Sequence, residues 1–467
     1  MHPKFVRKEA LDIFAFLTVP YVHTYASLAV MGILILRSLK NADNAIKALA
    51  FGIFIVIGNP GISENHPSIA SLKWILLIFA FGSIILHSQK KGFKIRNTAP
   101  LLISLWLFCV VAAVLSIISS RYLTISIFRL FSFAIGATTL IIAFRISPRS
   151  IEEWKNWFFT FYMVLCALSL LLVFHPWGYF RNGSGFQGIT VHPQTLGVLL
   201  TPIASYVALK LITLTGRLKL FVILLILLTM LWLSGARTAM LALVLSFGFT
   251  ILFAAYYKGL ISKSKVTISI LSVAAITVLS VIFFGEQLEP VFAAFVDKSQ
   301  TSTTFDDVNM TTEHLLMRSR GPQIENLIRN IEYQPLWGVG FGMDGPYGVR
   351  HVETNALLGV PISAPVEAGF LPLAIVSQTG VIGTVFFLLF IGRYLAGVFR
   401  SHDAEMIAFA TGALFVNLGE AIFFSLGGSG MWMWIILAFC FSAQFKLSNE
   451  YNIVIKNNPR PLPDGAS

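Results

Sequence analysis

Two arginines precede a short amphipathic pattern in the one long polar segment of this chain, residues 286–369. Arg318 and Arg320 stand just before Pro322, and apolar residues then recur at helical spacing up to Ile331. Proline is favoured in the first turn of a helix, and a helix N-terminus carries unpaired N–H groups and about half a positive charge. We therefore expect a helix whose beginning binds phosphate with both guanidinium groups. The alternative is an amphipathic surface helix with solvated arginines.

The rest of the chain is apolar enough to indicate a polytopic membrane protein. Hydrophobic residues make up 56% and charged residues 12% of its 467 residues, whereas soluble domains carry roughly 25% charged residues. The formal charge of +12 comes from basic residues spread over short loops, which indicates membrane orientation and not a nucleic-acid partner. The three cysteines lie apart in apolar runs and are interpreted as core residues: Cys109, Cys166 and Cys440.

We expect an all-α polytopic bundle of about 12 or 13 membrane spans with one large, partly helical loop. The first apolar run, residues 11–36, is broken near Pro20, and its topology stays open. Further runs lie at 45–58, 69–87, 99–118, 122–144, 157–175, 195–214, 218–234, 238–257, 266–284, 370–392, 404–424 and 431–445. The expected parts of this single membrane domain are spans in 1–284, the large loop in 285–369, spans in 370–446 and a tail in 447–467.

Lysine and arginine concentrate in alternate connections, which predicts the orientation of the spans. The basic connections and the tail are assigned to the cytoplasm, and the large loop to the outside, which is the periplasm in a bacterial inner membrane. Five ionisable residues then gather on the outer side: Arg129, Arg181, His192, Arg237 and Glu420. An arginine in hydrocarbon costs about 2.5–3.5 kcal/mol, so Arg129 should face a cavity or a partner. The alternative is an ion pair with Glu420 that locks the bundle.

Two glycine-rich stretches do not indicate a nucleotide site. Residues 183–188 match G-x-G-x-x-G only formally, because no strand precedes them and no βαβ unit surrounds them. Residues 338–342 are interpreted as a flexible turn that brings its backbone close to another segment. The nine histidines show no metal-binding spacing, so no metal is expected.

Several of these residues together resemble the O-antigen ligase and polysaccharide polymerase superfamily. The most specific part is Arg320 followed, after the predicted helix, by Pro-Leu-Trp-Gly-Val-Gly-Phe-Gly at 335–342. The stretch Leu-Ser-Gly-Ala-Arg-Thr-Ala at 233–239 and His-Pro-Gln at 192–194 also resemble this superfamily. The resemblance runs from about Arg181 to Gly383.

The resemblance implies a transferase without metal or other cofactor that takes a glycan from undecaprenyl diphosphate outside the inner membrane. Its implied partners are this lipid-linked oligosaccharide donor, a glycan acceptor and membrane lipids, with a chain-length regulator or export proteins in addition. Many ligases of the superfamily have a histidine shortly before a Gly-Val-Ile-Gly turn, and residues 365–372, ahead of that turn at 380–383, contain none. This departure favours a polymerase of exopolysaccharide or O-antigen type over a ligase acting on lipid A-core.

Glycosyl transfer from a lipid diphosphate needs cations for the departing diphosphate and a base for the acceptor hydroxyl. We expect Arg237 and Arg320 to stabilise the diphosphate, because a guanidinium group grips phosphate oxygens through two N–H bonds. Arg181, His192, Arg318, Arg129 and Glu420 are expected to bind substrate. Glu367 is the candidate base, and its alternative role is a structural pair with one of these arginines.

Two other classes of function compete with the enzyme. A transporter or flippase also has many spans with charge inside the membrane, but such proteins tend to show repeated halves around a midplane site. This sequence shows no such repeat, and its polar residues crowd one face. A structural partner in a polysaccharide export complex is the third alternative.

Overall fold

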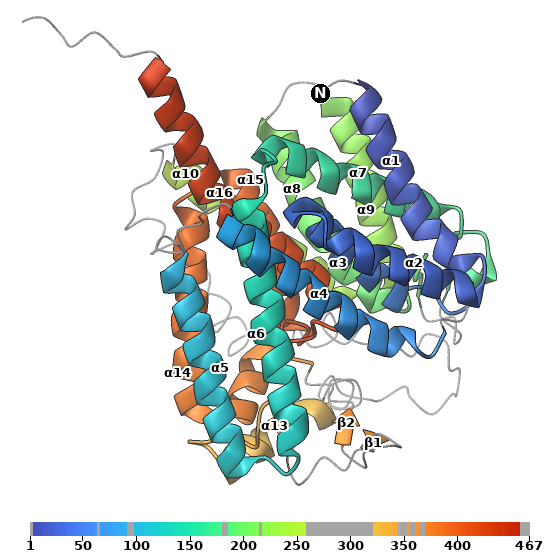
Figure 1. Cartoon of the computed structure of the whole chain (residues 1–467). Helices are drawn as coiled ribbons and strands as arrows, with labels where there is room; N and C mark the ends of the chain where they lie inside the picture. The colour runs from blue at the N-terminus through green and yellow to red at the C-terminus, as the bar shows by residue number, and fades with distance from the viewer. Residues whose placement is uncertain are drawn as a thin grey trace, which may run out of the picture.

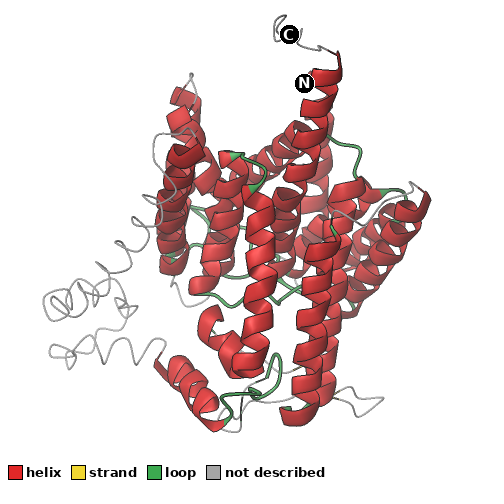
Figure 2. Cartoon of the chain, turned by 90° about the vertical axis from the view of Figure 1, so that its left-hand side faces the viewer, coloured by secondary structure: helices red, strands yellow, loops and turns green. Residues whose placement is uncertain are grey.

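The computed structural model describes residues 3–62, 66–90, 98–179, 185–213, 217–257, 321–343, 345, 353–354, 361–363 and 369–457. Most of these residues are helical, and the helices run beside one another between two ends of the bundle (Figures 1 and 2). The predicted all-α bundle is confirmed. Helix α13 and the two short strands lie at the lower end in Figure 1, which we call the loop-bearing end.

The first half of the described chain contains eight α-helices and two 3-10 turns. They are α1 (Pro3–Thr18), η1 (Val19–Tyr21), α2 (Thr24–Ser38), α3 (Ala42–Val56), α4 (Ile69–Lys90), α5 (Ala99–Ser119), α6 (Leu123–Ile146), α7 (Ile151–Leu170), η3 (Pro176–Gly178) and α8 (Pro193–Thr213). The later elements are α9 (Arg217–Ser234), α10 (Arg237–Tyr257), α13 (Gly321–Tyr333), β1 (Glu353–Thr354), β2 (Pro361–Ser363), α14 (Leu371–Phe399), α15 (Ala404–Phe415), η4 (Val416–Leu418) and α16 (Ser429–Asn457). The strands β1 and β2 pair antiparallel.

Within the described ranges, six helices are long and apolar enough to cross a membrane: α4, α5, α6, α8, α10 and α14. Shorter apolar helices are α2, most of α9, α15 with η4, and the first part of α16. The predicted run at 266–284 lies outside the described residues. Two helices end before the predicted runs do, α7 at Leu170 and α15 at Phe415. Pro176 and Gly419 follow these ends, and both residue types oppose continuation of a helix.

The first apolar run forms a helical hairpin that turns at the predicted break near Pro20. The Asp12 carboxylate of α1 lies 2.6 Å from the Arg37 guanidinium near the end of α2. Tyr21, at the turn, donates its hydroxyl proton to the Ile189 carbonyl, 3.1 Å away. Helices α1 and α2 are therefore antiparallel, and the start of α1 lies on the same side of the bundle as Arg37. The basic N-terminal residues then lie on the same side as the basic connection after α2, as the charge rule requires.

Ion pairs gather at the end opposite α13, which we call the ion-pair end. Glu9 of α1 contacts the Lys47 ammonium at 2.7 Å and the Arg149 guanidinium at 2.8 Å. A second group joins Lys155 of α7 to Asp403 and Glu405, at 3.1 and 2.8 Å. Burial alone would lower the pKa of Lys155, but the two carboxylates outweigh burial and raise it. Lys155 therefore stays charged, and it ties α7 to the start of α15.

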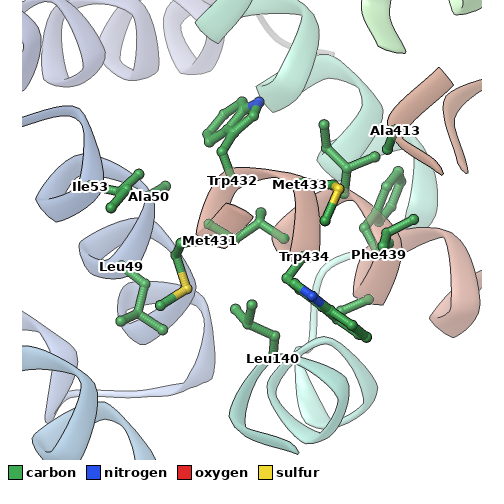
Figure 3. Close-up of a cluster of buried hydrophobic side chains, with 14 of the residues drawn as sticks. Leu49, Ala50, Ile53, Leu140, Ala413, Met431, Trp432, Met433, Trp434 and Phe439 are labelled. Atoms are coloured by element: carbon green, nitrogen blue, oxygen red, sulfur yellow. The ribbon is translucent and has the colours of Figure 1, made fainter. Parts of the chain in front are cut away.

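The core is built around the first turns of α16 (Figure 3). Four successive large side chains, Met431 to Trp434, are all buried there. They reach α3, α6 and α15, and Figure 3 shows them between Ile53, Leu140 and Ala413. Trp432 donates its indole proton to the Tyr162 hydroxyl, and Trp434 donates to the Phe423 carbonyl, both at 2.8 Å. Helix α16 is thus buried on every side at this level, as expected for a central helix.

The hairpin predicts which residues share a side of the membrane. In single-cysteine variants, Lys8→Cys and Lys40→Cys should react with an impermeant thiol reagent from one side, and His23→Cys from the other. All three side chains are exposed, so labelling of membrane vesicles of known sidedness decides the matter. Labelling of positions 8 and 23 from the same side would contradict the hairpin.

Candidate active site at the loop-bearing end

The helix predicted after Pro322 is present as α13, and this prediction is confirmed. Its buried Leu327 packs with Ala374 of α14 and with Ala421, which lies beyond the end of η4. Its solvent side carries an ion pair between Glu325 and Arg329, one helical turn apart. Helix α13 is therefore fixed on the end of α14 by one apolar face.

Helix α14 is interrupted at Gly380, whose backbone (φ 62°, ψ −173°) is not helical. The turn that follows α13 occupies this interruption, and we call residues 335–343 the docked turn. Val339 donates its backbone N–H to the Ser377 carbonyl at 2.9 Å, and Gly340 donates to the Gln378 carbonyl at 3.1 Å. The carbonyls that the interruption leaves open are thus satisfied by the docked turn.

The backbone N–H groups of α14 that follow Gly380 have their acceptors in the docked turn. Val381 donates its N–H to the Pro335 carbonyl at 2.9 Å, and Ile382 donates to the Leu336 carbonyl at 3.4 Å. The docked turn therefore donates hydrogen bonds to the part of α14 before Gly380 and accepts hydrogen bonds from the part after it. Non-helical backbone inside a membrane bundle is tolerated only where protein groups or water satisfy it, and here the docked turn does so.

Glycine is required at this junction because the two backbones approach too closely for a side chain. A Cβ atom on Gly380 would lie 2.2 Å from the Leu336 carbonyl oxygen, and one on Gly338 would lie 2.4 Å from the Gln378 carbonyl carbon. Gly338, Gly340 and Gly342 also have positive φ angles, which glycine adopts without steric cost. The prediction that this stretch brings its backbone close to another segment is confirmed.

Phe341 and Arg129 fix the far part of the docked turn. Phe341 is fully buried, with its ring 4.9 Å from the Phe424 ring, and it donates its N–H to the Ser116 hydroxyl at 3.0 Å. Arg129 donates from Nη1 to the Gly342 carbonyl, so it meets the partner expected of an arginine in an apolar helix. Gln378 accepts the Gly342 N–H through Oε1 at 2.9 Å.

Arg237 and Glu420 come from neighbouring elements. Arg237 is the first residue of α10, after a turn in which Gly235 has a φ of 61°. Thr238 Oγ1 lies 3.5 Å from Glu420 Oε1. A Cβ atom on Gly419 would lie 2.1 Å from the Thr238 side chain, so the segment after η4 packs directly against the start of α10. A positive helix end, an arginine and a carboxylate are thereby brought together.

His192 lies at the start of α8, at the same end of the bundle. Its ring Nδ1 accepts the N–H of Gln194 at 3.2 Å, so the side chain caps the helix. The preceding loop is tied to the turn before α10, because Phe186 donates its N–H to the Leu233 carbonyl at 2.9 Å. His192 and Arg237 therefore stand at the beginnings of two helices that pack together.

The contacts of Ala421 join these two groups of residues. Ala421 packs with Leu327 of α13 and Ala374 of α14, and the adjacent Glu420 approaches Thr238. Arg129, His192, Arg237 and Glu420 thus all lie at the loop-bearing end. Arg181, Arg318, Arg320 and Glu367 lie outside the described residues, so their roles stay predictions. Among the described side chains, no group of three His, Cys, Asp or Glu residues is placed to hold a metal.

Two residues at this end were missed by the sequence analysis. Asn59 is fully buried, and its Nδ2 donates to the Trp177 and Gly188 carbonyls at 2.6 and 2.7 Å. It ties the connection after α3 to the loop before α8, and the sequence Asn-Pro-Gly at 59–61 was its only local signal. Lys73, in the first turns of α4, donates to the Gly427 carbonyl at 3.1 Å. A cation inside an apolar run was the signal there.

Comparison with known families supports the resemblance drawn from the sequence. Residues 222–388 match the family described as O-antigen ligase. This range begins within α9 and includes the Arg237 turn, α13, the docked turn and the interruption of α14. A comparison with curated proteins found no match.

The junction at Gly380 can be tested with a second glycine of the same helix as control. Gly380→Ala should destabilise the protein by on the order of 1–3 kcal/mol, since its backbone conformation is strained for any other residue. A Cβ atom on Gly392 meets nothing within 4 Å, so Gly392→Ala should unfold at or above the wild-type temperature. Thermal unfolding of the purified proteins measures both effects. Equal unfolding temperatures for the two variants would show that the docked turn does not depend on Gly380.

Proposed function

We propose that this chain, whose residues 222–388 match the O-antigen ligase family, is a polymerase of bacterial surface polysaccharide. It would transfer glycan repeat units from undecaprenyl diphosphate to a growing glycan, on the periplasmic face of the inner membrane. The observation that carries this proposal is that matched residues, among them Arg237 and the docked turn, lie at the loop-bearing end together with Arg129, His192 and Glu420. The ion-pair end of the bundle, where α1 begins, would face the cytoplasm.

The proposed reaction breaks the bond between the anomeric carbon and the diphosphate oxygen of the donor. An acceptor hydroxyl oxygen attacks this carbon, its proton passes to a base, and the diphosphate leaves with the bonding electrons. Negative charge that develops on the leaving oxygen is stabilised by positioned cations and helix N-termini. Arg237 offers both, because its guanidinium group stands at the start of α10.

We assign the remaining roles by the position of each residue in the chain. Arg318 and Arg320 immediately precede α13 in the sequence, and Arg181 lies in the loop before α8. They would bind the diphosphate and the glycan together with His192 and Glu420. Arg129 would act indirectly, because it holds the Gly342 carbonyl of the docked turn.

Glu367 is the proposed general base. It precedes Gly369 in the sequence, and Gly369 leads into α14, so we infer a position where a lipid-anchored donor and an acceptor in water can meet.

The polymerase assignment, in preference to a ligase, comes from one departure in the sequence. Residues 365–372 contain no histidine ahead of Gly380-Val381-Ile382-Gly383. A lipid-linked donor, a glycan acceptor and surrounding lipids are the partners that this proposal requires. A chain-length regulator or export proteins would join them in the cell.

Arg237→Lys should abolish or strongly reduce polymer formation although the protein still inserts into the membrane. Lysine keeps the charge but loses the two parallel N–H bonds to phosphate oxygens. The matched control is Arg400→Lys, because Arg400 is exposed at the ion-pair end of α14 and should tolerate the change. The measurement is the chain length of surface polysaccharide on gels from cells that contain each variant. Normal polymer from Arg237→Lys would remove this residue from the site.

Glu367→Gln should still bind the lipid-linked donor but elongate the glycan about 10²–10⁴-fold more slowly, which is the usual effect of losing a general base. The assay uses purified protein, lipid-linked repeat units and no added metal. Glu332→Gln, on the exposed side of α13, is the control and should elongate normally. Near-normal elongation by Glu367→Gln would exclude it as the base, and loss of donor binding would make it a structural partner of an arginine.

A further inference from the structure

Helix α13 and the residues after it carry an exposed apolar surface. Ile324 and Ile328 of α13 are 38% and 44% exposed, although both side chains are strongly apolar. Just beyond the helix, Leu336 and Trp337 are 53% and 43% exposed. We call Ile324, Ile328, Leu336 and Trp337 the α13 apolar surface.

The side chains of α13 divide into three faces. Leu327 and Asn330 are buried against the bundle, whereas Glu325, Arg329 and Glu332 are exposed and charged. At helical spacing, Ile324 and Ile328 lie between these two faces. Such an arrangement is typical of a helix that lies in a membrane interface, with one side on protein, one in lipid and one in water.

The apolar surface is continuous with the exposed side of a membrane span. Leu336 lies directly beside α14, because its carbonyl accepts the Ile382 N–H at 3.4 Å. The neighbouring Val381, and then Val385 and Leu388 further along the helix, are 51%, 49% and 61% exposed. Helix α14 is apolar and long enough to cross a membrane, so these side chains face lipid. Leu336 and Trp337 extend that lipid-facing stripe past the interruption at Gly380.

We propose that the α13 apolar surface is a lipid-binding surface that seats α13 in the interfacial layer of the bilayer. Trp337 has the amphipathic ring that is enriched at this level, and isoleucine and leucine enter the acyl region beneath it. Burial of apolar side chains then holds the helix at the membrane, while the charged face with Glu325 and Arg329 stays in water.

This surface would place the start of α13 at the depth of a lipid headgroup. Arg318 and Arg320 precede that start in the sequence, so they would meet the diphosphate of a donor that remains dissolved in the bilayer. This consequence rests on the proposed function, whereas the lipid contact itself does not. The lipid contact would thus set the level of α13 relative to the membrane.

The test places a spin label on single cysteines in the full-length protein, in vesicles of phosphatidylethanolamine and phosphatidylglycerol. The three native cysteines, all buried, are first replaced by alanine. Ile328→Cys and Trp337→Cys probe the surface, Val385→Cys is the lipid-facing control, and Glu332→Cys is the control on the charged face of the same helix. The measurement compares collisions of each label with oxygen, which concentrates in lipid, and with a water-soluble nickel chelate.

We expect labels at 328 and 337 to give an oxygen-to-chelate collision ratio close to that at 385 and well above that at 332. Ratios at 328 and 337 equal to that at 332 would overturn the proposal, because the surface would then lie in water. Protection from both reagents would also overturn it, because protein and not lipid would then cover the surface. Elongation by the same vesicles is measured in parallel, so a failure of the proposed function is seen separately from a failure of the lipid contact.

Discussion

The backbone hydrogen bonds between the docked turn and the interrupted helix α14 are the constraint on which the loop-bearing end depends. Four bonds connect residues 335–340 to both sides of Gly380. A buried backbone group without a partner costs about 1–3 kcal/mol, so neither the turn nor the interruption is stable without the other. Glycine is needed on both sides, because the close approach of the two backbones leaves no room for a Cβ atom on Gly338 or on Gly380. This mutual dependence fixes α13 relative to the membrane spans.

The same junction explains how distant parts of the chain form one site. Phe341 enters the core beside Phe424, a few residues beyond Glu420, and Ala421 packs against the cluster formed by Leu327 and Ala374. The segment after η4 is thereby held between α13 and the first turn of α10, where Arg237 stands. A rigid scaffold of this kind would suit the proposed reaction, whose main need is the fixed placement of cations around a departing diphosphate. The α13 apolar surface would, in addition, set the depth of this helix in the bilayer.

Local sequence patterns predicted the helices, but they did not predict which segments pair with each other over long distances in the chain. The period of apolar residues after Pro322 predicted α13, and apolar run lengths predicted the helices of the bundle. The glycines at 338–342 indicated a close approach, but no local signal showed that the partner is α14, because backbone bonds depend little on side-chain identity. The break at Pro20 was predicted, yet the hairpin was missed, although Glu9 and Asp12 were available to pair with Lys47 and Arg37. Asn59 was missed because a buried amide has no periodicity.

The most direct test of this account asks whether α13 stays on α14 while the protein works. Leu327 and Ala374 pack together, so the Leu327→Cys/Ala374→Cys double variant should form a disulfide in membranes under mild oxidation. We predict that the cross-linked protein elongates lipid-linked repeat units at a rate close to that of the same protein after reduction. Failure to cross-link, or elongation that is lost on oxidation and restored by reduction, would contradict the claim that the docked arrangement is the active one.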